Sequence, residues 1–157
     1  PVSALQEDSA VEVTPLGDAA AAAVESLPKY GPQALAMRAT DGKMYALRPK
    51  DAAMLDTLEP SHSLAWRRLA LAFLHAYLID RVITPKLRAG QAPEIHYIKS
   101  IEDAVTDATQ TKGTVFFMQP NTMGELREVC NAGDLMPQKS TFFYPKLASG
   151  LVINPLN

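Results

Sequence analysis

The chain has 157 residues, of which 47% are hydrophobic and 20% charged, and its formal net charge is -2 at pH 7. A chain of this length and composition can bury a core of its own, which excludes wholesale disorder. The slightly acidic balance argues against nucleic acid as a partner, because proteins that bind nucleic acids usually carry a basic excess.

The first 17 residues are mixed and polar, which predicts a tail or an edge strand. We expect residues 18–157 to form a single α+β domain. Because the chain begins with Pro1 and not with methionine, we also expect it to be a processed or trimmed piece of a longer protein. The first helix is predicted over Ala19–Ser26, an alanine-rich run with Asp18 placed as its N-cap.

A β-hairpin is predicted by two alternating runs, Ala34–Arg38 and Met44–Arg48, which flank an Asp-Gly pair at 41–42. Asp-Gly between such runs is the strongest short-range hairpin signal, because these residues accept the positive φ angles of a tight turn. A short helix is expected over Asp51–Leu58, before Pro60.

The longest helix is predicted over Ser63–Ile83, where apolar residues recur at helical spacing in two stripes. Two stripes indicate burial on most sides, as for the central helix of a small domain. The stripes are Trp66, Leu69, Phe73 and Tyr77, and Leu64, Leu71, His75, Leu78 and Val82. We therefore expect this helix to pack on the sheet.

The C-terminal part is predicted to alternate strands and helices as β-α-β-α-β. Strands are expected over Glu94–Lys99, Thr114–Met118 and Leu151–Ile153. Strand–helix alternation favours right-handed crossovers, so the expected fold is α+β with a mixed sheet, an N-terminal hairpin and a long buried helix.

Each of the two helices in this part is expected to begin with a capping box. The boxes are Ser100 with Asp103 and Thr122 with Glu125. The second helix is expected to turn Met123, Leu126, Val129 and Cys130 inward and to end at Gly133. In that position Cys130 is a small buried hydrophobe and not a nucleophile.

The segment from Gly133 to Leu147 has no periodicity, and long irregular loops in compact domains are often functional. It combines lysines, hydroxyls and three consecutive aromatic residues, although it lacks the glycines of a phosphate-binding loop. Ammonium and hydroxyl groups together suit a phosphate or a carboxylate. The alternative is a brace in which the aromatic rings cap the core. The candidate ligand-binding residues of the loop are Lys139, Ser140, Thr141, Tyr144 and Lys146.

The run Met136–Leu147, followed by Gly150-Leu151-Val152, resembles the C-terminal signature of an uncharacterised prokaryotic family catalogued as domain of unknown function 1015. Weaker similarity includes the hairpin, Leu74-His75 and His96-Tyr97. The resemblance implies that this chain is the C-terminal portion of a longer protein whose N-terminal portion is missing. It also implies a link to serine metabolism and a kinase-like activity of that missing portion.

The three histidines, His62, His75 and His96, do not have metal-ligand spacing, so no metal is expected, and the residues indicate no cofactor. His75 lies on an apolar stripe, where a hydrogen-bonded core histidine is the favoured interpretation over a catalytic base. His96 alternates with Ile95 and Tyr97 as in a strand. With His75, it is a candidate ligand-binding residue, and we expect its side chain to point toward the Lys139 loop.

Two interpretations of function remain open. In the first, the chain helps an enzyme to bind a small anionic metabolite through the Lys139–Lys146 loop. In the second, it is a non-catalytic domain that docks against the missing N-terminal portion. The longest apolar run, Leu69–Ile79, is too short to span a bilayer, and a lone cysteine gives no support to secretion. We therefore expect a cytoplasmic protein without membrane contact.

Overall fold

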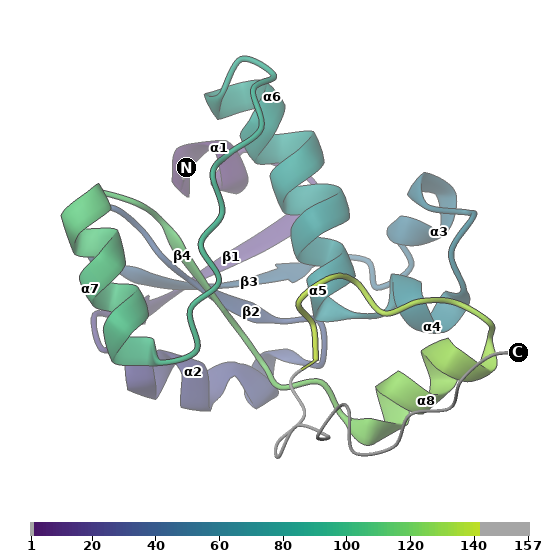
Figure 1. The fold of residues 1–157 in the computed structure, drawn as a ribbon. Helices are drawn as coiled ribbons and strands as arrows, with labels where there is room; N and C mark the ends of the chain where they lie inside the picture. Colours follow the sequence, from purple (N-terminus) through teal and green to yellow (C-terminus); the bar gives the residue numbers. More distant parts are fainter. Residues whose placement is uncertain (1, 142–157) are drawn as a thin grey trace, which may run out of the picture.

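Four strands form one sheet in the order β1-β3-β2-β4 (Figure 1). The computed structural model describes residues 2–141. Its strands are β1 (Val11–Gly17), β2 (Leu35–Arg38), β3 (Met44–Pro49) and β4 (Val115–Met118). The predicted α+β class is confirmed. The prediction of a mixed sheet is wrong for the described residues, because all three strand pairings are antiparallel.

The helices fall into an N-terminal, a central and a C-terminal group. Before the hairpin lie α1 (Val2–Gln6), α2 (Ala20–Ser26) and the 3-10 turn η1 (Leu27–Tyr30). Between β3 and β4 lie α3 (Leu55–Leu58), α4 (Leu64–Arg67), α5 (Ala70–Ala72), η2 (Phe73–Ile83), α6 (Thr84–Leu87) and α7 (Ile101–Thr111). After β4 comes α8 (Met123–Asn131).

The predicted hairpin is confirmed as β2–β3, with Leu35 opposite Leu47 and Arg38 opposite Met44. Gly42 adopts a φ of 88°, which a residue with a Cβ rarely accepts. The Asp41 carboxylate accepts a hydrogen bond from the backbone N–H of Lys43 at 3.1 Å. The turn chemistry that the sequence predicts is therefore present.

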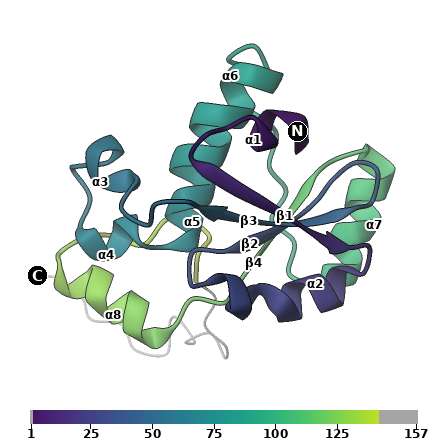
Figure 2. The same cartoon turned by 180° about the vertical axis from the view of Figure 1, so that it is seen from behind.

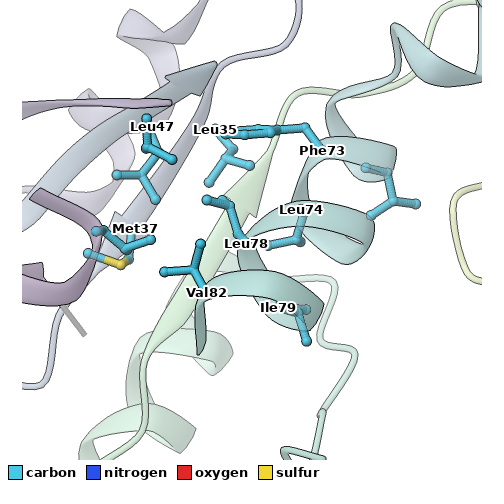
Figure 3. Close-up of a cluster of buried hydrophobic side chains, with 11 residues drawn as sticks. Leu35, Met37, Leu47, Phe73, Leu74, Leu78, Ile79 and Val82 are labelled. Carbon is cyan, nitrogen blue, oxygen red and sulfur yellow. The ribbon is translucent and has the colours of Figure 1, made fainter. Parts of the chain in front are cut away.

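Helix η2 covers one face of the sheet, and the main core lies between them (Figure 3). Leu35, Met37 and Leu47 project from the strands toward Leu78 and Val82 of the helix. Phe73 is fully buried in the same cluster. The predicted packing of the long helix on the sheet is thus confirmed.

Helices α2 and α7 cover the other face, as both views of the fold show (Figures 1 and 2). Small side chains at Ala34 and Ala36 of the hairpin meet Ala23 of α2 and Ala104 of α7. Because Phe117 is also buried there while its neighbours Phe116 and Met118 pack on the η2 side, β4 places apolar side chains on both faces.

The long helix predicted over Ser63–Ile83 is not one continuous helix. It breaks at Leu69, whose backbone is extended with φ −70° and ψ 137°. The break turns Trp66 and Leu69 toward a third cluster with Leu55 and Val129, whereas Phe73 faces the sheet. In one straight helix Trp66, Leu69 and Phe73 would lie on a single stripe, so the break is what separates the partners of Trp66 and Leu69 from those of Phe73.

After the break, the helix runs through η2 and α6 to Leu87, beyond the predicted end at Ile83. η2 is wound with wide π-type turns, in which the Thr84 N–H donates to the carbonyl of Ile79, five residues earlier. Pro85 lies in the first turn of α6, where the missing N–H is tolerated.

Two local expectations are wrong. Asp18 does not cap α2, because the helix begins one residue later with Ala19 as its N-cap and no side-chain cap bond. Residues 94–99 form no strand and are exposed. A strand added to a sheet with both faces covered would bury the alternate polar residues Glu94 and His96. The strand predicted over Leu151–Ile153 lies outside the described residues.

The two predicted helix starts are found, but only one has a complete capping box. Glu125 returns a hydrogen bond to the backbone N–H of Thr122, whose hydroxyl caps the N–H of Glu125. Ser100 caps the N–H of Asp103, but its hydroxyl donates to Glu102 instead. Aspartate is one methylene shorter than the Glu or Gln of a full box.

Helix α8 buries a narrower stripe than predicted. Val129 is fully buried and Leu126 half-buried, whereas Met123 is 66% exposed. Cys130 is exposed as well, so its predicted burial is wrong. Because α8 packs on the molecule along one side only, residues flanking Val129 point to solvent.

Candidate functional site

A shallow pocket of about 210 Å³ lies where the chain leaves β4 and where the segment after α8 returns to it. Its lining combines apolar side chains with two amides, one hydroxyl and one ammonium group. The lining residues are Leu71, Met118, Gln119, Pro120, Asn121, Lys139 and Ser140. Two residues of the loop predicted to bind an anion, Lys139 and Ser140, therefore line a pocket together.

Gln119 and Asn121 hold this pocket together through their side-chain amides. Gln119 Nε2 donates to the carbonyls of Gly31 at 2.9 Å and Ala34 at 3.0 Å, which fixes the exit of β4 against the start of β2. Asn121 Nδ2 donates to the carbonyl of Ser140 at 2.5 Å. The turn after β4 is thus tied both to the hairpin and to the Lys139 loop.

Lys139 lies at the third position of a tight turn that begins at Pro137. The Ser140 N–H donates to the Pro137 carbonyl at 3.3 Å, and the Ser140 hydroxyl donates to the same oxygen at 2.6 Å. Lys139 has a φ of 61° there, in the left-handed region that favours glycine. A strained backbone of this kind is frequent at functional sites, although Ala89 and Lys112 share it here.

The charge of Lys139 is not neutralised by a neighbour. In residues 2–141, no carboxylate lies within 4.0 Å of its ammonium group. The nearby start of α8, by contrast, is occupied, because the Glu125 carboxylate accepts from both the N–H and the hydroxyl of Thr122. Among the described residues, the positive charge at this pocket therefore comes from Lys139 and not from the helix terminus.

Asp134 anchors the other end of the Lys139 loop. Its carboxylate accepts hydrogen bonds from the backbone N–H of Ser63 at 2.7 Å and of Leu135 at 2.8 Å, and it contacts His62 Nδ1 at 3.2 Å. Burial alone would raise the pKa of Asp134, but these bonds and the Ser63 side chain outweigh burial and lower that pKa to about 2. The His62 ring stacks on Trp66 with centroids 3.8 Å apart.

The helix turn before Asp134 leads the chain into this anchor. Gly133 has a φ of 73°, as predicted for the residue that ends the helix. Its N–H donates to the carbonyl of Cys130, while the Asp134 N–H donates to that of Val129. These two bonds satisfy the last carbonyls of α8 and fix the direction in which the loop departs.

The other predicted loop residues are not brought into the pocket lining. Thr141 follows Ser140 but is exposed and does not line the pocket. Tyr144 and Lys146 lie outside the described residues, as do the aromatic residues Phe142 and Phe143. Their part in a ligand site remains a prediction.

His75 lies one turn after the pocket residue Leu71, in η2. Its side chain is half-buried, and burial lowers its pKa against the opposing charge of Asp80. It makes no hydrogen bond within residues 2–141, so the hydrogen-bonded core histidine expected from its stripe is not found. His75 is not among the residues that line the pocket.

His96 belongs to a different region. Its two ring nitrogens contact Glu94 at 3.3 Å and Asp107 at 3.2 Å, and the bonds to Glu94 and then Asp107 raise its pKa. Asp107 belongs to α7, on the face of the sheet opposite η2. Neither His96 nor α7 contributes to the pocket lining.

Among the described residues, no cluster of three or more His, Cys, Asp or Glu side chains is arranged to hold a metal ion. Over the same residues, no helix has the length and apolar character to cross a bilayer. Comparison of the chain with protein-family models, with curated proteins and with solved structures gives no match.

Sequence reasoning missed three of the polar groups that build the site: Gln119, Asn121 and Asp134. The available signal for the first two is their position, in a short polar turn between a predicted strand and a capping box. Asp134 carries a weaker signal, because a carboxylate after a helix-ending glycine has many roles.

Proposed function

We propose that this domain binds a small anionic metabolite, a phosphate or a carboxylate, in the pocket that Lys139 and Ser140 line. The supporting observation is that Lys139, which has no carboxylate partner in residues 2–141, borders a pocket of about 210 Å³ with two amide side chains. The ammonium supplies the attraction, and the amides fix the turns that border the pocket.

The Lys139 turn is held at both of its sides before any ligand arrives. Asn121 Nδ2 binds the Ser140 carbonyl, and the Asp134 carboxylate binds the backbone of Ser63. A loop that is already fixed loses little conformational entropy when it binds, which favours a small ligand with few contacts.

Titration calorimetry with inorganic phosphate and with acetate tests the proposal. The Lys139→Gln variant keeps the length of the side chain and removes its charge. We expect it to weaken binding by about 1.5–3 kcal/mol, the usual contribution of a hydrogen bond to a charged group. Lys112→Gln is the matched control, because Lys112 shares the positive φ but ends α7 and does not line the pocket. Equal binding by both variants would refute the proposal.

We further propose that the chain is the C-terminal portion of a longer cytoplasmic protein of the family that it resembles, with the link to serine metabolism and any kinase-like chemistry in the N-terminal part. The support is the run from Met136 to Leu147 in the sequence. Expression of the longer parent, followed by a phosphoryl-transfer assay with and without Lys139→Gln, tests this arrangement.

A second candidate function is a docking domain without catalysis of its own. The observation in its favour is the exposure of Leu64 and Leu135, at 56% and 82%, next to the Ser63–Asp134 bond. Neighbouring exposed apolar side chains often mark contact surfaces. If the longer parent loses stability when Leu64 and Leu135 are both changed to Ser, while residues 1–157 alone do not, docking is the better description.

A further inference from the structure

The polar atoms of the Lys139 pocket that have no hydrogen bond restrict the chemistry of the ligand beyond its charge. This inference rests on the function proposed above. Among residues 2–141, Lys139 is the one cationic side chain in the pocket lining, and no arginine of that range lines it. With Glu125 already at the start of α8, no second positive group is offered there. One ammonium suits a single negative charge better than the several charges of a nucleotide.

The amides around Lys139 present acceptors. Both Nε2 hydrogens of Gln119 are used by the carbonyls of Gly31 and Ala34, which leaves Oε1 without a partner in residues 2–141. Asn121 spends an Nδ2 hydrogen on the Ser140 carbonyl, and its Oδ1 has no hydrogen bond in the described chain. A carboxylate without a neighbouring donor cannot satisfy these oxygens, because a carboxylate only accepts.

Ser140 reinforces this preference. Its hydroxyl hydrogen is committed to the carbonyl of Pro137 at 2.6 Å, so its oxygen can only accept from a ligand. The pocket thus combines one ammonium donor with acceptors from Gln119, Asn121 and Ser140. A complementary ligand carries one anionic group and at least one hydrogen-bond donor.

The size of the pocket limits the rest of the ligand. Its volume of about 210 Å³ is that of roughly seven water molecules, at about 30 Å³ each in the liquid. Leu71, Met118 and Pro120 form the apolar part of the lining. They offer an apolar surface to a short carbon chain.

We propose that the Lys139 pocket binds a small monocarboxylate that has a hydroxyl or ammonium donor on the neighbouring carbon, that is, a small 2-hydroxy or 2-amino acid. The carboxylate binds Lys139. The neighbouring donor binds the amide oxygen of Gln119 or Asn121, and the short carbon chain contacts Leu71 and Met118.

Calorimetry with residues 1–157 tests the proposal with four probes: L-lactate, L-alanine, propionate and inorganic phosphate. Propionate matches the other two acids in carbon number and lacks the donor. We expect L-lactate or L-alanine to bind about tenfold more tightly than propionate, the effect of one satisfied hydrogen bond. In Asn121→Ala this ratio should fall, while Asn131→Ala, an exposed change in α8, should leave it unchanged.

The outcomes separate this inference from the proposed function. If all four probes bind in a manner that depends on Lys139, but the donor-bearing acids bind no better than propionate, the ligand class is wrong and anion binding stands. The same holds if phosphate binds most tightly. If no probe binds in a Lys139-dependent manner, both proposals fail. The ratios between the probes come from the unmodified chain, so they test the ligand class even where a variant does not fold.

Discussion

The carboxylate of Asp134 accepts a hydrogen bond of 2.7 Å from the backbone N–H of Ser63, although the two residues are separated by 71 positions in the sequence. This bond joins the N-cap of α4 to the residue that follows α8, and the loop that carries Lys139 begins there. The geometry of the proposed binding site therefore depends on a carboxylate outside it.

Replacing this carboxylate should destabilise the fold. For Asp134→Asn we expect a loss of about 1–3 kcal/mol at pH 7, because the charge-assisted hydrogen bonds from the N–H groups of Ser63 and Leu135 are weakened. Urea unfolding measures the loss. The control is Asp18→Asn, since Asp18 is exposed and forms no cap on α2, and it should change stability by less than about 0.5 kcal/mol.

The same carboxylate predicts a pH dependence with a definite sign. The folded pKa of Asp134 is about 2, below the value of about 3.9 in unfolded chains. Its contribution is therefore fully present above pH 4 and is lost as the pH falls toward 2. The stability difference between wild type and Asp134→Asn should shrink over this range, and a difference that stays constant to pH 2 would contradict the assignment.

Tyr77 predicts a second dependence of stability on pH, with the opposite sign. Its hydroxyl donates to Asp8 at 2.9 Å, and burial together with that bond raises its pKa to about 12. Tyrosine in an unfolded chain ionises near pH 10. The contribution of the Tyr77 hydroxyl to the stability of the fold is therefore present below pH 10 and is lost as the pH rises through about 12. Absorbance titration of tyrosinate should show a late-ionising group that disappears in Tyr77→Phe.

The main core should be sensitive at Phe73. This side chain is fully buried between η2 and the sheet, and its replacement by alanine should cost about 3–5 kcal/mol. Leu64→Ala is the control, because Leu64 is 56% exposed. A loss below about 1 kcal/mol at Phe73 in urea unfolding would place this ring outside the core.

Substitution of Lys139 can separate the effect of its charge on binding from the effect of its backbone conformation on stability. Lys139→Gly removes the ammonium and relieves the positive φ, so the fold should be unchanged or gain up to about 1 kcal/mol. Anion binding should be lost at the same time. Lys112→Gly should have the same effect on stability and none on binding, which calorimetry and urea unfolding measure together.

Cys130 is predicted to react in the folded protein. Its exposure at the end of α8 makes it accessible to a bulky thiol reagent without prior unfolding. We expect labelling at the rate of a free cysteine, unchanged by low concentrations of urea. Labelling that requires denaturant would restore the buried position that its sequence pattern predicts.

The elements that the sequence predicted well depend on neighbours along the chain. The hairpin at β2–β3 and the capping box of Thr122 and Glu125 need only a few consecutive residues. The break at Leu69 was not predictable in this way, because the residues on both sides of it have good helical patterns. Its cause is tertiary, since Trp66 and Phe73 pack in different clusters.

The residues of the candidate site also divide into those that a local pattern predicts and those that depend on distant partners. Lys139 and Ser140 were found because their loop lacks periodicity and carries charge. Gln119 and Asn121 were missed because their bonds to Ala34 and Ser140 span 85 and 19 residues, and no local pattern encodes such partners. The antiparallel pairing of β4 with β2 likewise joins segments that lie far apart in the sequence.

That position of β4 has a consequence for folding on the ribosome. Leu35–Arg38 pairs on one side with β3, which is synthesised at once, and on the other with Val115–Met118, which is synthesised much later. Until β4 emerges, β2 has an open edge lined with buried apolar residues, a state in which strands pair with other chains. Nascent or truncated chains that end before β4 should therefore aggregate, even though the hairpin and η2 can already pack together.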